Sequence, residues 1–142
     1  MTATPEEVFH RLVNGVSRLV AGDATQADAL PMLYAEQTRV EHPMAFPTVK
    51  PLLSRDELRR HFAAGPGALP LISDHHPTDI EIHQTVDPEV IVAEFSYRGT
   101  VDGRAYVVPC VFVMRIRDGQ IVESRDYLNS QDRARAIQEA AS

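Results

Sequence analysis

The sequence has a single cysteine, Cys110, among its 142 residues, so no internal disulfide can form. Residues 1–10 lack the basic start and the apolar run of a signal peptide, and no apolar stretch approaches the ~20 residues of a membrane span. Basic patches are missing as well, and the net charge is −6. Nucleic acids and anionic membranes attract clustered Lys and Arg, so we expect neither as a partner. These absences predict a cytoplasmic protein.

The remaining composition is that of an ordinary globular chain. Hydrophobic residues make up 44% and charged residues 24%, and the length is sufficient for a substantial core. The sequence shows no internal repeat, low-complexity tract or linker. We therefore expect one domain over residues 1–142.

Three strand-like runs follow one another between Val90 and Asn129. They are joined by Asp102-Gly103 and Asp118-Gly119, and Asp-Gly between alternating apolar runs is the strongest short-range signal for a hairpin. The pattern predicts an antiparallel meander that ends near Asp126, where we expect any chemistry to lie.

Capping boxes predict the starts of two helices, Thr4 with Glu7 and Ser54 with Glu57. The other expected elements are a helix from about residue 23 to Tyr34 that Pro31 interrupts, a strand at 38–42, a proline-rich loop at 43–53, a helix end at the glycines of 65–67, an irregular strand at 72–86 and a last helix after Ser130. Helices come first and antiparallel strands last, which indicates an α+β fold.

The strand at 104–117 is apolar on both faces. One face carries Val107, Pro109, Val111 and Val113, and the other carries Tyr106, Val108, Cys110, Phe112, Met114 and Ile116. The helices can cover only one face of a sheet, so we expect a homodimer that forms through the outer face. In the last strand, alternation places Val122, Ser124, Asp126 and Leu128 together, with Ile121 on the opposite side. A carboxylate facing inward in such company needs a partner or a task.

Several short motifs in a characteristic order resemble one known superfamily. They are Ala21-Gly22-Asp23, Tyr34-Ala35-Glu36, Val40-Glu41-His42-Pro43, a capped third helix, and the closing stretch from Gly119 to Tyr127. Together they resemble the nuclear transport factor 2-like superfamily and, within it, the SnoaL-like polyketide cyclases and ketosteroid isomerase relatives. The resemblance implies a cone-shaped, curved antiparallel sheet wrapped around three N-terminal helices, with a deep apolar pocket (a cystatin-like α+β barrel). It does not fix the reaction, because this fold hosts many activities.

The catalytic set of the steroid isomerases is largely absent from the chain. By the resemblance, His42 occupies the place of their general-base aspartate, and Tyr34 matches a tyrosine of the pocket network. Their two oxyanion donors would fall at Gly15 and near Val111, so the isomerase mechanism is not expected here.

Asp126 is the residue that the resemblance preserves best. It matches one aspartate of the Asp-Arg-Asp set of the limonene epoxide hydrolases, but Phe95 and Tyr97 stand where the other two members belong. It also matches the aspartate acid/base of the SnoaL-like cyclases, which is the closest correspondence.

We therefore predict Asp126 and His42 as catalytic residues and an apolar site around them. The predicted substrate-binding residues are Tyr97, Tyr34, His61, Phe95, Val111 and Leu128. A histidine and a carboxylate in an apolar cavity can exchange protons at neutral pH. The alternative is structural: His42 is a satisfied buried histidine and Asp126 is its partner or that of Arg39.

Two other groups of residues are given non-catalytic interpretations. Asp74, His75 and His76 with Asp79 or His83 have the residue types of a zinc site, but their spacing does not follow a zinc motif, and we predict no metal. Cys110 lies in an apolar strand and is interpreted as core or interface.

The predicted function is that of a small, cofactor-free enzyme of the SnoaL-like type. It would bind an apolar polyketide-, steroid- or terpenoid-like molecule and catalyse isomerisation, cyclisation or hydration by general acid–base chemistry. The alternative is a non-catalytic binding or assembly module that keeps the cone, as the missing isomerase and hydrolase sets would allow.

Overall fold

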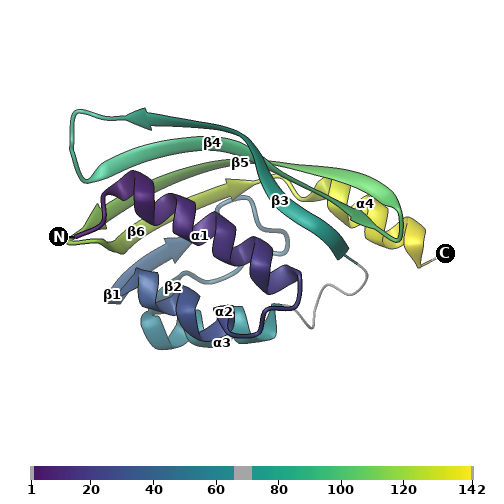
Figure 1. Cartoon of the computed structure of the whole chain (residues 1–142), viewed down its shortest axis with the longest axis horizontal. Coiled ribbons are helices and arrows are strands. Elements are labelled where there is room, and N and C mark those ends of the chain that lie inside the picture. Colours follow the sequence, from purple (N-terminus) through teal and green to yellow (C-terminus); the bar gives the residue numbers. More distant parts are fainter. Residues whose placement is uncertain (1, 66–71, 142) are drawn as a thin grey trace.

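A curved, open sheet of six strands with helices packed against it forms the fold, seen in a computed structural model that describes residues 2–65 and 72–141 (Figure 1). In chain order the elements are α1 (Pro5–Val20), α2 (Gln26–Ala29), the 3-10 helix η1 (Leu30–Leu33), β1 (Tyr34–Glu41), β2 (Leu52–Ser54), α3 (Arg55–Ala64), β3 (Ile72–Gln84), β4 (Val90–Val101), β5 (Arg104–Arg117), β6 (Gln120–Leu128) and α4 (Gln131–Ala140). The predicted α+β class is confirmed. None of the described helices is both long enough and apolar enough to cross a membrane.

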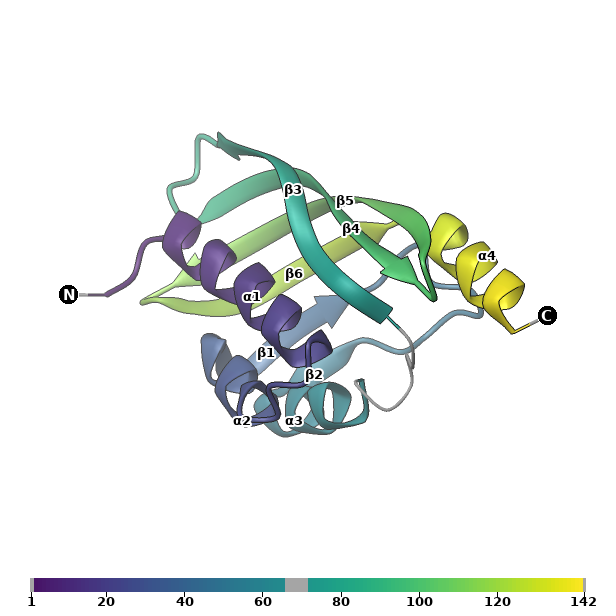
Figure 2. The same cartoon turned by 45° about the vertical axis from the view of Figure 1, so that its right-hand side comes forward.

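The strand order is β2-β1-β6-β5-β4-β3, and every pair is antiparallel except β1 with β6. Helix α1 lies across one face of this sheet, here called the inner face, while α2 and α3 lie beside β1 and β2 (Figure 2). Helix α4 packs at the far end against β5 and β4. The described helices thus leave the opposite face, the outer face, uncovered.

The helix cap and the two hairpin turns that the sequence predicts are present in the structure. Thr4 caps α1, and its hydroxyl accepts from the backbone N–H of Glu7 while the Glu7 carboxylate accepts from the backbone N–H of Thr4. The turn Asp102-Gly103 has φ angles of 49° and 79°, and Asp118-Gly119 has 53° and 75°. Positive φ at both central residues is what a tight type I′ hairpin requires, so the predicted meander is confirmed.

Three local predictions are wrong. Tyr34 is not helical, because η1 ends at Leu33 and Tyr34 begins β1 by pairing with Ile121. Leu52 and Leu53, predicted as loop, belong to the short strand β2, because Leu52 pairs with Val40 of β1. Ile121 is fully buried on the inner face, because a register shift in the β5–β6 pair moves it to the same side as Ser124 and Asp126. Pro66 and Gly67, predicted with Gly65 to end α3, lie outside the described residues.

An aromatic cluster joins α1 to the inner face of the sheet. The Phe9 ring of α1 meets the rings of Phe95 and Phe112 edge-on at 5.2 and 6.4 Å, and these two rings meet each other at 5.0 Å. Edge-to-face pairs at such distances add stabilisation beyond the apolar area that they bury. The cluster fixes α1 on the sheet and leaves a cavity at the other end of the helix.

Candidate functional site

A cavity of about 320 Å³ lies between the inner face of the sheet and helices α1 and α3. Its walls are mostly apolar and come from every strand and from α1, α3 and α4, while its polar lining residues are Tyr34, His42, His61, His75, Tyr97, Asp126 and Arg133. A mainly apolar cavity with a few convergent polar groups is the usual form of a small-molecule site. The volume falls at the lower end of the range for such sites, roughly 300–1,000 Å³.

Asp126 is the buried carboxylate of this cavity. It projects from β6 on the inner face and is 7% exposed. Burial raises its pKa to about 7, and a hydrogen bond donated by the Ser124 hydroxyl opposes that rise only in part. At neutral pH the group therefore exists in both protonation states, which is the condition for donating and accepting protons there.

Two histidines adjoin Asp126. The Nε2 atom of His42 lies 3.8 Å from Oδ2 of Asp126, a separation too long for a hydrogen bond. The rings of His42 and His61 are 5.8 Å apart. Burial lowers the pKa of both histidines, and His61 lowers that of His42 further. Neutral imidazoles thus face a carboxyl group that is itself partly neutral, so the pair forms no fixed ion pair at neutral pH.

Two buried tyrosines present free hydroxyl groups to the cavity. Tyr34 is 2% and Tyr97 is 5% exposed, and neither hydroxyl has a hydrogen-bond partner among the described residues. Every fully buried side-chain oxygen of the described chain has a hydrogen-bond partner. The two unpartnered tyrosine hydroxyls therefore retain some accessible surface, and it faces the cavity that both residues line. Burial, together with the charge of Asp126, raises the pKa of both tyrosines well above 10. They remain hydrogen-bond donors at any physiological pH.

The structure brings most of the predicted site residues together. Asp126, His42, His61, Tyr34, Tyr97 and Leu128 all line the cavity. Phe95 does not line it; its ring packs in the aromatic cluster behind Tyr97. The placement of Val111 in the pocket is wrong, because alternation along β5 points it to the outer face, where it is 36% exposed.

Sequence reasoning missed two polar residues of the cavity, His75 and Arg133. By sequence, His75 is considered only together with Asp74 and His76, as a zinc-ligand type without a zinc motif. In the structure His75 is 6% exposed, because Asp74 adopts a φ of 55° and the register of β3 shifts before residue 76. The irregularity of this strand was the available signal. Nothing in the local sequence of α4 distinguishes Arg133 from other helix-surface arginines.

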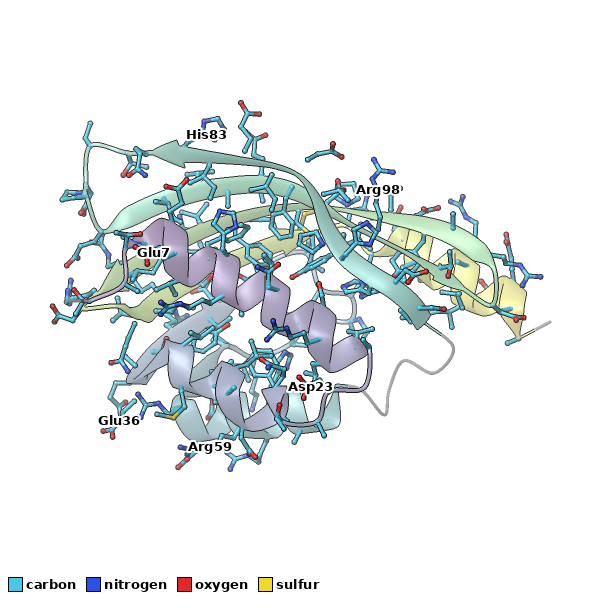
Figure 3. The ribbon with its side chains drawn as sticks, viewed as in Figure 1. Glu7, Asp23, Glu36, Arg59, His83 and Arg98 are labelled. Atoms are coloured by element: carbon cyan, nitrogen blue, oxygen red, sulfur yellow. The ribbon has the colours of Figure 1, made fainter. Side chains whose placement is uncertain are left out.

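The residues considered for a metal do not gather. Among the described residues, the group whose ligand atoms lie close together is Glu81, His83 and Glu94, and all three are exposed. They lie outside the cavity on β3 and β4, and Figure 3 shows His83 on the side of β3 away from α1. His75, by contrast, lines the cavity.

Comparisons with known proteins bear on the family and the fold. A family model described as the SnoaL-like domain matches residues 13–124. Over 54 residues the chain is 39% identical to an uncharacterized PhzA/B-like protein of Pseudomonas aeruginosa. That match spans 37% of this chain and only 38% of the relative's length, so the relative's properties do not transfer as a whole.

Solved structures share the fold over nearly the full chain. A provisionally named polyketide cyclase from Xanthomonas campestris superposes with a TM-score of 0.70 at 16% identity, covering 94% of this chain and 96% of that one. A Catenulispora acidiphila protein with a ketosteroid isomerase-like fold, solved with trimethylamine, gives 0.66 at 19%, covering 96% and 95%. A phenazine biosynthesis-related protein from Pseudomonas aeruginosa gives 0.64 at 17%, covering 94% and 89%.

Identities below 25% establish a shared fold and nothing about the reaction. The family model is more specific, because it spans most of the chain, from the middle of α1 to Ser124 in β6. This chain belongs to the SnoaL-like domain family of the nuclear transport factor 2-like superfamily.

Proposed function

We propose that the protein is an enzyme that moves a proton on a small apolar substrate, with Asp126 as the general acid/base. The observation that carries the proposal is a buried carboxyl group with a pKa of about 7 in an apolar cavity that also holds two unpartnered tyrosine hydroxyls. When the pKa of a carboxyl group is near the working pH, a substantial part of the group is ionised and can accept a proton, and its basicity is high enough to drive the transfer.

The proposed chemistry is enolisation. Asp126 removes a proton from the carbon next to a substrate carbonyl, and the electron pair of that C–H bond moves to form the enolate. The hydroxyls of Tyr34 and Tyr97 donate hydrogen bonds to the enolate oxygen, as preorganised donors do in oxyanion holes. Asp126 then returns the proton to a different atom, which completes an isomerisation. Alternatively, the enolate carbon attacks a second carbonyl, whose oxygen becomes an alkoxide and takes the proton from Asp126, which completes a cyclisation. His42, whose Nε2 atom lies 3.8 Å from Oδ2 of Asp126, stays neutral and is the partner of Asp126 beside the reacting carbon.

The test is deuterium exchange in D₂O, followed by proton NMR, with β-tetralone as a two-ring apolar carbon acid. We expect the protein to accelerate exchange of its α-protons and the Asp126→Asn variant to lose about a hundredfold or more of that acceleration. Glu123→Gln is the matched control, because Glu123 is an exposed carboxylate on the same strand. Exchange at the buffer rate with wild-type protein, or an unchanged rate in Asp126→Asn, would refute the proposal.

The second candidate is a non-catalytic module that binds a small molecule. The observation in its favour is the absence of the isomerase oxyanion donors, because Gly15 packs against Leu30 and Val111 lies on the outer face. This candidate predicts ligand binding without any acceleration of exchange, so the same samples separate the two.

We also propose that two copies associate through the outer face of the sheet. Val107, Pro109, Val111 and Val113 of β5 lie on this face, which the helices do not cover. An apolar strip of this kind is typical of a surface that a partner covers. The predicted cytoplasmic location stays a prediction.

A further inference from the structure

Arg133 places a positive charge at the cavity, and no described carboxylate forms an ion pair with it. It belongs to the first turn of α4, a helix that is fixed to the sheet where the Asp132 carboxylate accepts from the backbone N–H of Val107 at 2.8 Å. Arg133 lines the cavity and is half-buried. Among residues 2–65 and 72–141, it forms no hydrogen bond or ion pair. A guanidinium is always charged and offers five N–H donors, so an unpaired one beside apolar walls is poised for an anionic ligand.

Asp126 does not neutralise this charge. No ion pair joins the two residues, and the pKa of Asp126 is governed by burial and by Ser124. The charge of Arg133 acts instead on His75, Tyr97, Tyr106 and Cys110, whose ionisation it shifts toward the less positive or more anionic form. Asp132, next to Arg133, is held at Val107, whereas Asp126 pairs with Phe112 farther along β5. The cavity thus has two polar ends, with Arg133 and His75 at one and Asp126 and His42 at the other. Tyr97, which senses both Asp126 and Arg133, lies between them.

His75 completes the Arg133 end with a neutral ring. Its Nδ1 atom lies 2.5 Å from the Tyr106 hydroxyl, and the ring stacks on that of Tyr97 with centroids 4.4 Å apart. The Nε2 atom of His75 has no hydrogen-bond partner among the described residues. Every fully buried side-chain nitrogen of the described chain has a partner, so this Nε2 atom must retain some accessible surface. Burial and the Arg133 charge lower the pKa of His75 to about 4. The ring thus adds a hydrogen-bonding group without a negative charge that would occupy Arg133.

We propose that the Arg133 end of the cavity binds a carboxylate of the substrate, so that the natural substrate is a small apolar carboxylic acid whose rings extend toward Asp126. The inference rests on the proposed function, because it concerns the same cavity and orients the substrate for proton transfer. A guanidinium binds a carboxylate through two parallel N–H···O bonds, which fixes orientation as well as position. The apolar rings of the substrate then pack against the wall formed by α1, where Leu12, Val16 and Leu19 face the cavity.

The test compares naphthylacetic acid with naphthylacetamide, its uncharged counterpart of nearly the same shape, by isothermal titration calorimetry at pH 6. At this pH the acid is ionised while Asp126, with a pKa of about 7, is mostly protonated and repels it little. We expect wild-type protein to prefer the acid by roughly ten- to a hundredfold, the range for a hydrogen bond to a charged group. Arg133→Gln is expected to lose that preference while it retains the affinity for the amide, which also shows that the cavity is intact.

Arg135→Gln is the matched control, because it removes the same charge from an exposed position of the same helix. It is expected to keep the preference for the acid. Equal affinities for acid and amide in the wild type, a preference that survives in Arg133→Gln, or binding of neither compound would overturn the inference. If the acid preference depends on Arg133 but β-tetralone exchanges no faster than in buffer, the inference stands and only the proposed catalysis fails.

Discussion

Replacing Asp126 with asparagine should stabilise the protein at alkaline pH and much less at acid pH. In the folded state, burial raises the pKa of Asp126 from 3.8 to about 7, so folding favours the neutral acid. Below pH 3.8 both the folded and the unfolded chain carry the proton, and the group does not oppose folding. As the pH rises toward 7, the unfolded chain releases the proton first, and the free energy of unfolding falls. Asparagine is neutral throughout and can still accept the hydrogen bond from Ser124.

The magnitude follows from the two pKa values. A shift of about three pH units corresponds to roughly 4 kcal/mol at pH values above both pKa values. Between pH 5 and pH 8.5 the advantage of Asp126→Asn over the wild type should therefore grow by about 3 kcal/mol. Lowered pKa values of His42, His61 and His75 act in the opposite direction, but both proteins share these histidines. Their contribution largely cancels in the difference.

The assay is urea denaturation followed by circular dichroism, at one fixed protein concentration because association also stabilises the folded state. Wild type, Asp126→Asn and Glu123→Gln are compared at both pH values. Glu123 is exposed, so its variant should differ from wild type by the same amount at pH 5 and pH 8.5. If the Asp126→Asn difference is also independent of pH, Asp126 has an ordinary pKa, and the electrostatic basis of the proposed acid/base is lost.

Two further variants test the packing and the outer face. Gly99→Ala should lower the free energy of unfolding by about 1–3 kcal/mol, because the core has no room for the added methyl group. The new Cβ would lie 2.5 Å from the Tyr106 hydroxyl and 3.0 Å from the Ser73 carbonyl oxygen. An unchanged urea midpoint would contradict this packing. Val111→Glu should convert a dimer into a monomer in analytical ultracentrifugation, whereas Val86→Glu, at an exposed turn outside β5, should not. A wild-type monomer, or a Val111→Glu dimer, would rule out the proposed interface.

The parts of the fold that could be predicted are those with short-range causes. The Thr4–Glu7 capping box and the Asp102-Gly103 turn act within four residues, and both formed as predicted. The errors concern residues whose state depends on distant strands. Tyr34 leaves the helix because β1 pairs with β6 more than eighty residues later, and β2 exists only through its pairing with β1. Tertiary pairing outweighs local propensity in such segments.

The candidate site divides in the same way. Strand alternation was enough to orient Asp126 inward, because a period of two residues depends only on the strand itself. Alternation also predicts that Val111 points outward, on the opposite face from Tyr106 and Phe112. Val111 was nevertheless included in the predicted pocket because of the resemblance to the steroid isomerases. His75 and Arg133 depend on a shift in the register of β3 and on the docking of α4, and neither follows from local sequence.

The electrostatics of the cavity leave one group suited to the proposed proton transfer. Burial lowers the pKa of His42, His61 and His75, so these histidines are neutral at pH 7. It raises the pKa of Tyr34 and Tyr97, which stay protonated, so none of these five side chains changes charge near pH 7. Among the described residues that line the cavity, Asp126 is the group whose pKa is raised to about 7. In the proposed reaction, a proton on the substrate therefore exchanges with one defined group, while the neutral donors around it stabilise the charge that forms. The same desolvation that makes Asp126 costly to the fold at alkaline pH makes it a usable acid and base near neutrality, as expected where function and stability compete at one residue.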